Sequence, residues 1–483
     1  MTNPAQTGPI TAASVPSRVT PSAGSRTAPS IGPRTAPSIG PSGAPNTEPR
    51  TAPNTEPRTG SRSAQRRVIR AQHQDIDDKP FIVIWEVTRA CQLVCKHCRA
   101  DAQTRADPRQ LSTAQGKALL DDIARWDTPR PLVVLTGGDP FERADLAELV
   151  AYGTAAGLSV ALSPSVTPKF TAERLAELHR AGAKAVSLSL DGARPQTHDA
   201  FRGFEGTYAA TRRAATTVRD EGLRLQVNTT VTRDNVHELP QLLGDVLEMG
   251  VGLWSVFFLV PTGRGEHLGA LAAEEVEDVL HWLADVSSLV AIKTTEAPQY
   301  RRVVIQRAAA RASNLPLPVT GPLHDQLVAD TVEVLGHEIV PTRVPRPPID
   351  VNAGRGFVFV DHTGDVYPSG FLPFRCGSVK DAGLRRIYRE SPILRSLRRP
   401  EEFGGSCGRC EFRDVCGGSR SRAYAVTGDL LGADPSCVWQ PGAVAPATSV
   451  AGLPATAVAG LPAVGPSAAG GPGDTIGSAP WPE

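Results

Sequence analysis

Short apolar runs alternate with longer amphipathic stretches through the middle of this chain. Six runs rich in β-branched residues predict strands, at residues 81–87, 131–138, 158–164, 185–192, 223–232 and 251–261. Between them lie five stretches with apolar residues at helical spacing, at residues 112–126, 143–157, 171–182, 206–222 and 236–250. Ser112 or Thr113 is expected to cap the first helix, and glycines to end the second and third. Such strict alternation predicts parallel strands joined by crossover helices, an α/β fold.

The number of strand–helix units narrows the choice of α/β fold. Six units are too few to close an ordinary eight-unit barrel, so we expect a partial (β/α)6 TIM-type barrel. Functional residues of such folds gather at the carboxyl ends of the strands. Polar or glycine-rich positions follow four of the predicted strands, at Cys91 to Cys98, at Gly137 to Pro140, at Asp191, and at Asn228 with Thr230. We therefore expect one site at that end of the sheet.

The pattern changes beyond residue 265. Residues 266–350 contain two helical stretches within Pro-rich sequence and predict an irregular, partly helical connection. Residues 356–367 predict a hairpin around His362–Gly364. A second group of cysteines follows, so residues 351–440 are expected to form a small cysteine-rich domain after the barrel.

Composition separates both ends from this core. Residues 1–72 and 441–483 are rich in proline and small residues and contain near-repeats such as RTAPSIGP, which occurs at Arg26 and Arg34. Both segments have too little apolar surface to offset the entropy of ordering, so we predict disordered tails. Nine arginines and two glutamates make residues 1–70 basic, but the formal charge of the chain is only +1. That balance indicates no nucleic-acid partner.

The expected compartment of the protein bears on the chemistry of its cysteines. The sequence has no apolar signal segment and no run of about 18 apolar residues, so we expect neither secretion nor a membrane span. Regular prolines in the first 70 residues exclude the amphipathic helix of a transit peptide. Eight cysteines, clustered at metal-ligand spacing without a signal peptide, favour metal over disulfides and a reducing, cytoplasmic location.

Three of these cysteines follow the first predicted strand directly. Cys91, Cys95 and Cys98 form the pattern C-x3-C-x2-C. Three thiolates on one loop suit a cubane [4Fe–4S] cluster that keeps one iron without a protein ligand. The alternative is a zinc site completed by His97 or by a distant ligand.

The segment CQLVCKHC resembles the cysteine loop of the radical SAM enzymes, and the resemblance covers about residues 80–440. It implies that residues 78–265 form the partial barrel, with the loop after its first strand. It also implies that S-adenosylmethionine binds the open iron, and that an electron donor such as ferredoxin or flavodoxin reduces the cluster. Reductive cleavage would then yield a 5′-deoxyadenosyl radical that abstracts hydrogen from a substrate. His97 would pack beside the cluster, and the resemblance identifies no further catalytic residue.

The segment LTGGDP is similar to the glycine-rich turn of this family, usually Gly-Gly-Glu-Pro. The resemblance implies that Gly137, Gly138, Asp139 and Pro140 bind the amino group of S-adenosylmethionine. Asp139 stands where the family usually has Glu, so its carboxylate reaches one methylene less far.

Further contacts with S-adenosylmethionine are implied after the fourth and fifth strands. Ser189 and Asp191 in SLSLDG would face its carboxylate and ribose, and Asn228 would contact the ribose. Arg202 precedes a glycine, as in an Arg-Gly pair that binds the carboxylate in this family. The structural alternatives are a turn cap for Asp191, a satisfied strand-end amide for Asn228 and a solvated arginine for Arg202.

The second cysteine group has the pattern C-x2-C-x5-C with one more cysteine after it, formed by Cys407, Cys410, Cys416 and Cys437. It resembles the C-terminal part of SPASM/twitch auxiliary domains, which implies one auxiliary [4Fe–4S] cluster; zinc is the alternative. Ser369 stands where many members of that group carry a cysteine. Cys376 is then either a free thiol or an alternative ligand to Cys437.

Three segments indicate the substrate: FLVPTGRG at residues 258–265, CGG at 416–418 and YAVTGD at 424–429. They resemble the alternative haem-synthesis and denitrification-haem enzymes, which act on tetrapyrrole propionate side chains. Peptide maturases share the architecture but often begin with a folded leader-binding domain, which residues 1–72 are not expected to form. We therefore expect a tetrapyrrole-like substrate, or a peptide delivered by a separate protein.

Carboxylate-bearing substrates would need cationic partners. Six arginines lie between the barrel and the second cysteine group, and each is expected to be solvated: Arg301, Arg302, Arg307, Arg343, Arg346 and Arg355. A non-catalytic scaffold that carries clusters, or a zinc-stabilised binding protein, remains as an alternative to an enzyme.

Overall fold

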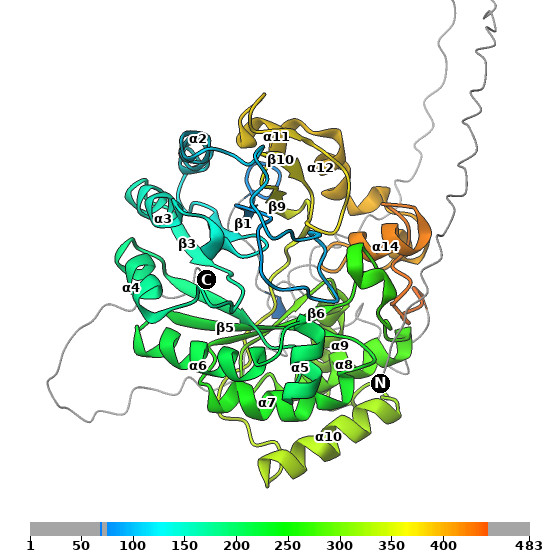
Figure 1. Cartoon of the computed structure of the whole chain (residues 1–483). Helices are drawn as coiled ribbons and strands as arrows, with labels where there is room; N and C mark the ends of the chain where they lie inside the picture. Colours follow the sequence, from blue (N-terminus) through cyan, green and yellow to red (C-terminus); the bar gives the residue numbers. More distant parts are fainter. Residues whose placement is uncertain (1–67, 70–74, 443–483) are drawn as a thin grey trace, which may run out of the picture. The chain divides into compact units, whose positions relative to one another are not determined.

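A computed structural model describes residues 68–69 and 75–442 of the chain (Figure 1). The predicted disorder of residues 1–72 and 441–483 lies almost entirely outside the described residues.

One sheet organises the described chain. Seven strands lie side by side in chain order, and each pairs in parallel with the next. They are β1 (Ile82–Glu86), β2 (Leu132–Thr136), β3 (Ser159–Leu162), β4 (Ala185–Ser189), β5 (Arg224–Val231), β6 (Leu253–Phe258) and β7 (Ile292–Thr295). The first six confirm the prediction, whereas the short β7 was not predicted. On its other side β1 pairs with β9 (Gly356–Val360). Among the described strands β7 therefore ends the sheet, and the barrel is open.

Helices cover the outer side of these strands (Figure 1). The five predicted helices are present as α2 (Thr113–Ala124), α3 (Leu146–Ala155), α4 (Ala172–Arg180), α6 (Thr207–Asp220) and α7 (Leu239–Glu248). Ser112 caps α2 in a capping box with Gln115. Gly157 and Gly182 follow α3 and α4 with φ of +81° and +109°, as expected of helix stops. The predicted α/β partial barrel is therefore confirmed.

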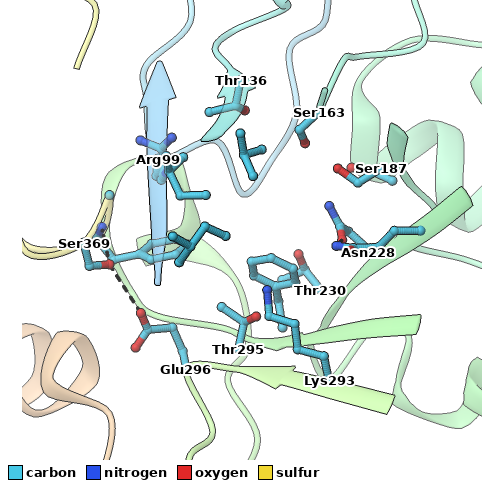
Figure 2. Close-up of a pocket in the computed structure, with 18 of the residues that line it drawn as sticks. Arg99, Thr136, Ser163, Ser187, Asn228, Thr230, Lys293, Thr295, Glu296 and Ser369 are labelled. Carbon is cyan, nitrogen blue, oxygen red and sulfur yellow. Dashed lines mark hydrogen bonds between the residues drawn. The ribbon is translucent and has the colours of Figure 1, made fainter. Parts of the chain in front are cut away.

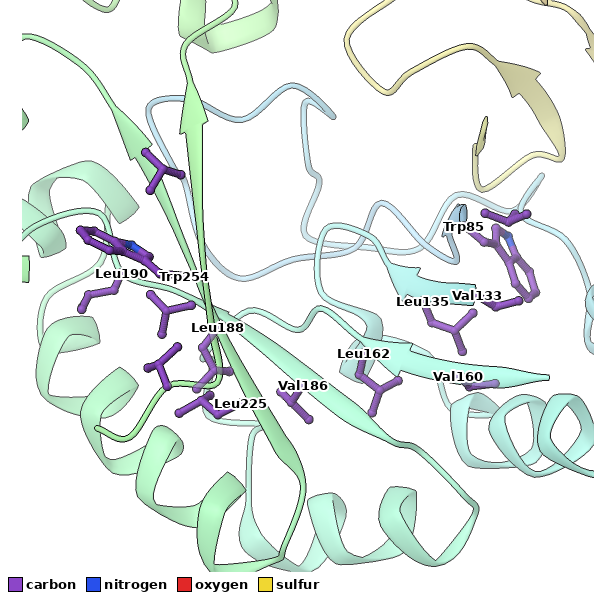
Figure 3. Packing of buried hydrophobic residues seen from close by; sticks show 14 of the residues in the cluster. Trp85, Val133, Leu135, Val160, Leu162, Val186, Leu188, Leu190, Leu225 and Trp254 are labelled. Carbon is purple, nitrogen blue, oxygen red and sulfur yellow. The ribbon is translucent and has the colours of Figure 1, made fainter. Parts of the chain in front are cut away.

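The two faces of each strand differ in chemistry. Most side chains that point outward are apolar and buried beneath the helices, as Figure 3 shows for Trp85, Val133, Leu135, Val160, Leu162, Val186, Leu188, Leu225 and Trp254. Inward-facing side chains are apolar near the start of the strands, where Ile82, Leu132, Ala161 and Ala185 form a small cluster. Toward the carboxyl ends the inner face becomes polar, which creates the setting for a site.

The C-terminal part extends the same sheet. The predicted hairpin is confirmed as β9 and β10 (Asp365–Tyr367), which pair antiparallel; β11 (Gly377–Ser378) adds to β10, and β8 (Asn352–Ala353) pairs with β9. Short helices follow, as α11 (Leu384–Glu390), α12 (Pro392–Leu397), α13 (Gly405–Arg409) and α14 (Arg420–Thr427). None of the helices in the described ranges has the length and apolar character needed to cross a membrane.

Residues 266–350 contain three helices and β7, which is one helix and one strand more than the partly helical connection predicted from the sequence. They are α8 (Ala273–Val286), α9 (Gln299–Ala312) and α10 (Pro322–Leu335), of which α8 and α9 were predicted. The small barrel helix α5 (Pro195–Arg202) was also not predicted. The predicted domain bounds at residues 265 and 350 stay a prediction.

Helix α9 corrects the expectation that its arginines are solvated. Arg301, Arg302 and Arg307 are buried. Arg301 donates from Nη1 to the carbonyl of Val415 at 2.8 Å, and Arg302 donates to Glu277 at 2.8 Å. Because α9 lies between α8 and the cysteine-rich segment, its polar face is covered and each guanidinium has internal acceptors.

The packing of α2 on β1 provides a test of this arrangement. A Cβ atom at Gly116 would lie 2.6 Å from Cη2 of the fully buried Trp85, so a larger residue has no room. We expect Gly116→Val to lower the free energy of unfolding by about 1–3 kcal/mol through overpacking. Ala118→Val, at an exposed position of the same helix, should cost less than about 1 kcal/mol. Urea unfolding followed by circular dichroism measures both, and equal costs would contradict this packing.

Candidate functional site

A cavity of about 410 Å³ lies inside the open barrel, and every strand from β1 to β7 contributes to its lining. Figure 2 shows polar side chains from several of these strands directed into it. Nine of the residues predicted from sequence line this one cavity: Cys91, Cys95, Cys98, Gly137, Gly138, Ser189, Asp191, Arg202 and Asn228. Asp139 and Pro140 are buried next to the cavity and do not line it.

The three cysteines lie on the loop after β1 and face the same space. The N–H of Cys91 donates to Gln103 at 2.7 Å, and that of Cys98 donates to Cys95 at 3.2 Å, so the backbone of the loop is held at both ends. Cys91 and Cys95 are buried, and burial raises the pKa of both thiols. The N–H of Leu93 points at Sγ of Cys91, 3.4 Å away. Thiolates at these positions therefore need positive charge close by.

That charge is present as two arginines. Arg202 and Arg264 both act on Cys95 in the direction that favours its thiolate. Arg202 ends α5 and is only 7% exposed, which excludes the solvated arginine considered from the sequence. Nε and Nη2 of Arg264 are buried without a hydrogen-bond partner among the described residues. A buried and a partly buried cation beside three thiols suit a group that brings net negative charge when bound.

Gly137 and Gly138 allow the loop after β2 to lie against the cysteine loop. A Cβ atom at Gly137 would be 2.5 Å from the carbonyl oxygen of Thr88, and one at Gly138 would be 2.4 Å from that of Ala90. Both acceptors are backbone atoms, which cannot move aside as a flexible side chain can. Any larger residue here would push the two loops apart, so these positions require glycine.

Asp139 is fully buried and has protein partners for both carboxylate oxygens. Oδ1 accepts from the N–H groups of Phe141 at 3.1 Å and Ser165 at 3.3 Å, and Oδ2 accepts from Oγ1 of Thr167 at 2.8 Å. Burial raises the pKa of Asp139 to about 6. Its carboxylate joins the loops after β2 and β3, and it is engaged with the protein rather than with the cavity.

Asp191 connects three elements at the rim of the cavity. Its carboxylate accepts from the backbone N–H of Thr230 on β5 at 2.7 Å and from Arg202 on α5 at 3.1 Å. Asn228 lies on β5 with its amide in the cavity, where its Oδ1 accepts from Gln226 at 2.7 Å (Figure 2). Ser189 is directly opposite Asn228 in the register of β4 and β5. Of the predicted contacts with S-adenosylmethionine, those after β4 and β5 thus form one continuous strip.

His97 is a stacking residue in this arrangement. Its ring stacks on Phe201 with the centroids 4.7 Å apart, and burial lowers its pKa to about 3, so it is neutral at ordinary pH. Among residues 68–69 and 75–442, no three His, Cys, Asp or Glu side chains are grouped in the geometry for a single metal ion. The donor set here is three thiols with nearby cations, which fits a thiolate-held iron–sulfur cluster.

The second cysteine group surrounds a separate, small cavity. It is lined by Cys407, Cys410, Cys416 and Cys437. Burial raises the pKa of Cys410 to about 12, and it also raises the pKa of Cys416 and of Cys437. Arg420 donates to Sγ of Cys407 at 3.5 Å, and the N–H of Phe412 donates to Sγ of Cys410 at 3.4 Å. Four thiols with donors around them fit a four-iron cluster that has a protein ligand for each iron.

Cys376 lies apart from this group. It packs against the main hydrophobic core, and its thiol is near the carbonyl of Phe374, 3.4 Å away. Burial raises its pKa to about 11. Of the two alternatives considered from the sequence, this placement favours Cys437 as the fourth cysteine of the group.

Three charged residues of the cavity were missed by sequence reasoning: Arg99, Lys293 and Glu296. Lys293 lies on β7, and Glu296 is the residue directly after that strand. The alternation of apolar and polar residues in AIKTTE was the signal that could have revealed this strand. Glu296 has a φ of +57°, which is unusual outside glycine, and its carboxylate accepts from the hydroxyls of Ser419 and Ser421. Burial raises its pKa. No local pattern predicts that conformation.

Comparisons with known proteins agree with this geometry. Residues 85–246 match the model of the Radical SAM superfamily. An AdoMet-dependent heme synthase from Oleidesulfovibrio alaskensis is 40% identical over 364 residues, which cover 74% of this chain and 87% of that protein. A mycofactocin maturase from Mycolicibacterium smegmatis is 31% identical over 381 residues, 76% of this chain and 85% of that protein.

Among solved structures, Streptococcus suis SuiB bound to S-adenosylmethionine aligns with a TM-score of 0.53 over 75% of this chain and 78% of its own, at 13% identity. At that identity the likeness concerns the fold alone. The sequence matches, the open parallel barrel and the cysteine loop after β1 together show that the chain belongs to the radical SAM superfamily, among relatives of the AdoMet-dependent heme synthases.

Proposed function

We propose that this radical SAM enzyme acts on a carboxylate-bearing side chain of a tetrapyrrole. The observation that carries the substrate class is the 40% identity to a heme synthase across 87% of that protein. The cavity supports the proposal, because its inner end is apolar and its outer end is polar and charged. An apolar ring with carboxylate substituents matches this division of surfaces.

The cysteine loop after β1 would bind the first cofactor. Cys91, Cys95 and Cys98 would hold a [4Fe–4S] cluster, and the cations Arg202 and Arg264 would offset its charge. When bound, the cluster and S-adenosylmethionine supply a radical able to remove a hydrogen atom from the substrate. The chain's own contribution is to position and enclose these groups.

The binding of S-adenosylmethionine is assigned to the strip along the strand ends. Gly137 and Gly138 would present backbone groups to its amino end, while Ser189 and Asn228 would face its ribose and carboxylate. Asp191 orients Arg202 through their 3.1 Å ion pair, which leaves the rest of the guanidinium for an incoming carboxylate.

The cysteine-rich segment would hold one auxiliary [4Fe–4S] cluster, with residues 351–440 as its domain and 266–350 as the connection. Four protein thiolates leave no iron open, so electron relay or structural support suits it better than substrate ligation. A ferredoxin or flavodoxin would be a suitable electron donor. Such clusters are oxygen-sensitive, and a reducing cytoplasm would suit them.

A peptide substrate is the second candidate, since a mycofactocin maturase is 31% identical to this chain. The two candidates differ in the ligand that the pure protein binds. Iron coproporphyrin III, a porphyrin with propionate side chains, is expected to bind the anaerobic protein at micromolar concentration and to be consumed with S-adenosylmethionine. Absorbance titration and product analysis measure these outcomes. Absence of binding would remove the tetrapyrrole and leave the peptide as the candidate.

Asp139 provides a second test. Its carboxylate either contacts S-adenosylmethionine directly or acts by joining the loops after β2 and β3. If its carboxylate acts by joining the loops, Asp139→Asn keeps one acceptor oxygen, places an amide N–H against the hydroxyl of Thr167, and binds S-adenosylmethionine like the wild type. Asp139→Ala leaves buried donors unpaired and should lower the free energy of unfolding by about 1–3 kcal/mol. Equal loss of S-adenosylmethionine affinity in both variants would instead support the direct contact predicted from the sequence.

The pH dependence of the free energy of unfolding tests the burial of the Asp139 carboxyl group. The raised pKa of about 6, against 3.8 for an ordinary Asp, means that the folded state holds this proton more tightly than the unfolded chain. Asp139 therefore destabilises the fold increasingly as the pH rises through that interval, and the effect is constant above it. Asp139→Asn lacks this titration, so its stability relative to the wild type should increase between about pH 4 and pH 6. A difference independent of pH would contradict the burial of this carboxyl.

A further inference from the structure

One arginine of the cavity wall has no role in the site described so far. Arg99 follows Cys98 directly, and its side chain, which is 20% exposed, lines the cavity. Its Nη1 donates to Oε2 of Glu86 at 3.2 Å. Within the described residues Nε and Nη2 of Arg99 have no hydrogen-bond partner, and neither atom is fully buried. These two nitrogens form the edge of a guanidinium that can donate two parallel hydrogen bonds to one carboxylate.

The guanidinium of Arg99 is held in a fixed position. Glu86 ends β1 and is buried, and its second carboxylate oxygen lies 3.0 Å from Nδ1 of His362. Cζ of Arg99 lies over the ring of Phe359 on β9, 4.4 Å from its centroid. A Cβ atom at Gly370 would be 2.8 Å from the same Cζ, so the chain passes close to the guanidinium there. An arginine held in this way loses little freedom when it binds an anion.

Two other arginines that line the cavity already have partners for their terminal nitrogens. Nη1 and Nη2 of Arg301 donate to the backbone carbonyls of Val415 and Val351. Arg202 is paired with Asp191 and assigned to S-adenosylmethionine. The accessible edge of Arg99 is therefore suited to a different anion.

Arg99 lies away from the residues assigned to S-adenosylmethionine. The side chains that hold it belong to β1 and β9, whereas Asn228 is on β5. Figure 2 shows Arg99 across the open space from Asn228. On the strands between them, the apolar side chains of Ile84, Val134 and Ala161 line the cavity. A carboxylate held by Arg99 would therefore belong to the substrate, with an apolar surface beside it for the rest of that molecule.

We propose that Arg99 binds a carboxylate group of the substrate through Nε and Nη2, with Glu86 as its positioning residue. The inference rests on the proposed function, since it names the residue that would hold a propionate of the tetrapyrrole. It adds a specificity rule, namely that the affinity for a porphyrin depends on its carboxylate charge through Arg99.

The test compares iron coproporphyrin III with its methyl ester, by absorbance titration of the anaerobic, cluster-loaded protein. Arg99→Met removes the charge and keeps most of the side-chain volume. It is expected to weaken binding of the free acid about tenfold, the loss of a charged hydrogen bond, and to leave binding of the ester unchanged. Arg99→Lys keeps the charge without the fork, so its affinity for the acid should be intermediate. Arg105→Met, at an exposed position of the same loop outside the cavity, is the matched control.

Gly370→Ala is a second variant that keeps the charge of Arg99. Its new Cβ atom would displace the flexible end of the Arg99 side chain from its position. The ratio of acid affinity to ester affinity should therefore fall in this variant as well. This variant decides the question if Arg99→Met fails to hold its clusters, which iron per chain reveals.

The possible results separate the two claims. An unchanged ratio of acid affinity to ester affinity in the cavity variants would overturn the subsite while the proposed function stands. Equal weakening for acid and ester gives such an unchanged ratio, because the residue would then act through the fold and not through charge. A wild type that binds acid and ester equally well would overturn the subsite too. A wild type that binds neither porphyrin would overturn the proposed function, and this subsite with it.

Discussion

The parallel sheet of this protein has two faces that must satisfy different surroundings, and the site follows from that constraint. Alternate residues of β1 to β7 point outward beneath the helices, where Trp85, Leu188 and Trp254 are fully buried. The residues between them must point inward. Among the described strands the sheet ends at β7 without closing, and its inner face borders a cavity. Polar side chains of this face border the cavity, and near the carboxyl ends the loops supply partners for them, as for Asp191 and Asn228.

Charge explains how these partners are arranged. The cysteine loop buries thiols whose ionised form is unfavourable without compensation, and Arg202 and Arg264 supply positive charge beside them. Asp191 holds Arg202 in place from the neighbouring strand end. The auxiliary cysteines repeat the arrangement with Arg420. In both places the chain combines donors and cations with thiols, which is the environment that a negatively charged iron–sulfur cluster requires.

Much of this could be predicted from the sequence, because local spacing determines it. The six strands, their helices and the two cysteine groups depend on periodicity and on residue types a few positions apart. The contribution of α9 could not be predicted in this way, because Arg301 looks solvated on its own helix and finds its acceptors at the distant carbonyls of Val351 and Val415. The same limit applies to Glu296, which has a left-handed backbone and whose carboxylate accepts from Ser419 and Ser421, more than 120 residues away. Asp139 was expected to face the cosubstrate, but the loop after β3 supplies its partners.

The central claim is that the barrel loop and the C-terminal cysteines each hold one four-iron cluster, and metal analysis tests it most directly. Iron, zinc and sulfide per chain should be measured after anaerobic purification of the native protein, a Cys91/Cys95/Cys98→Ala triple variant and a Cys376→Ala control. Two cubanes predict about eight irons in the native protein and the control, and about four in the triple variant. Zinc in place of iron, or iron unchanged in the triple variant, would contradict the account.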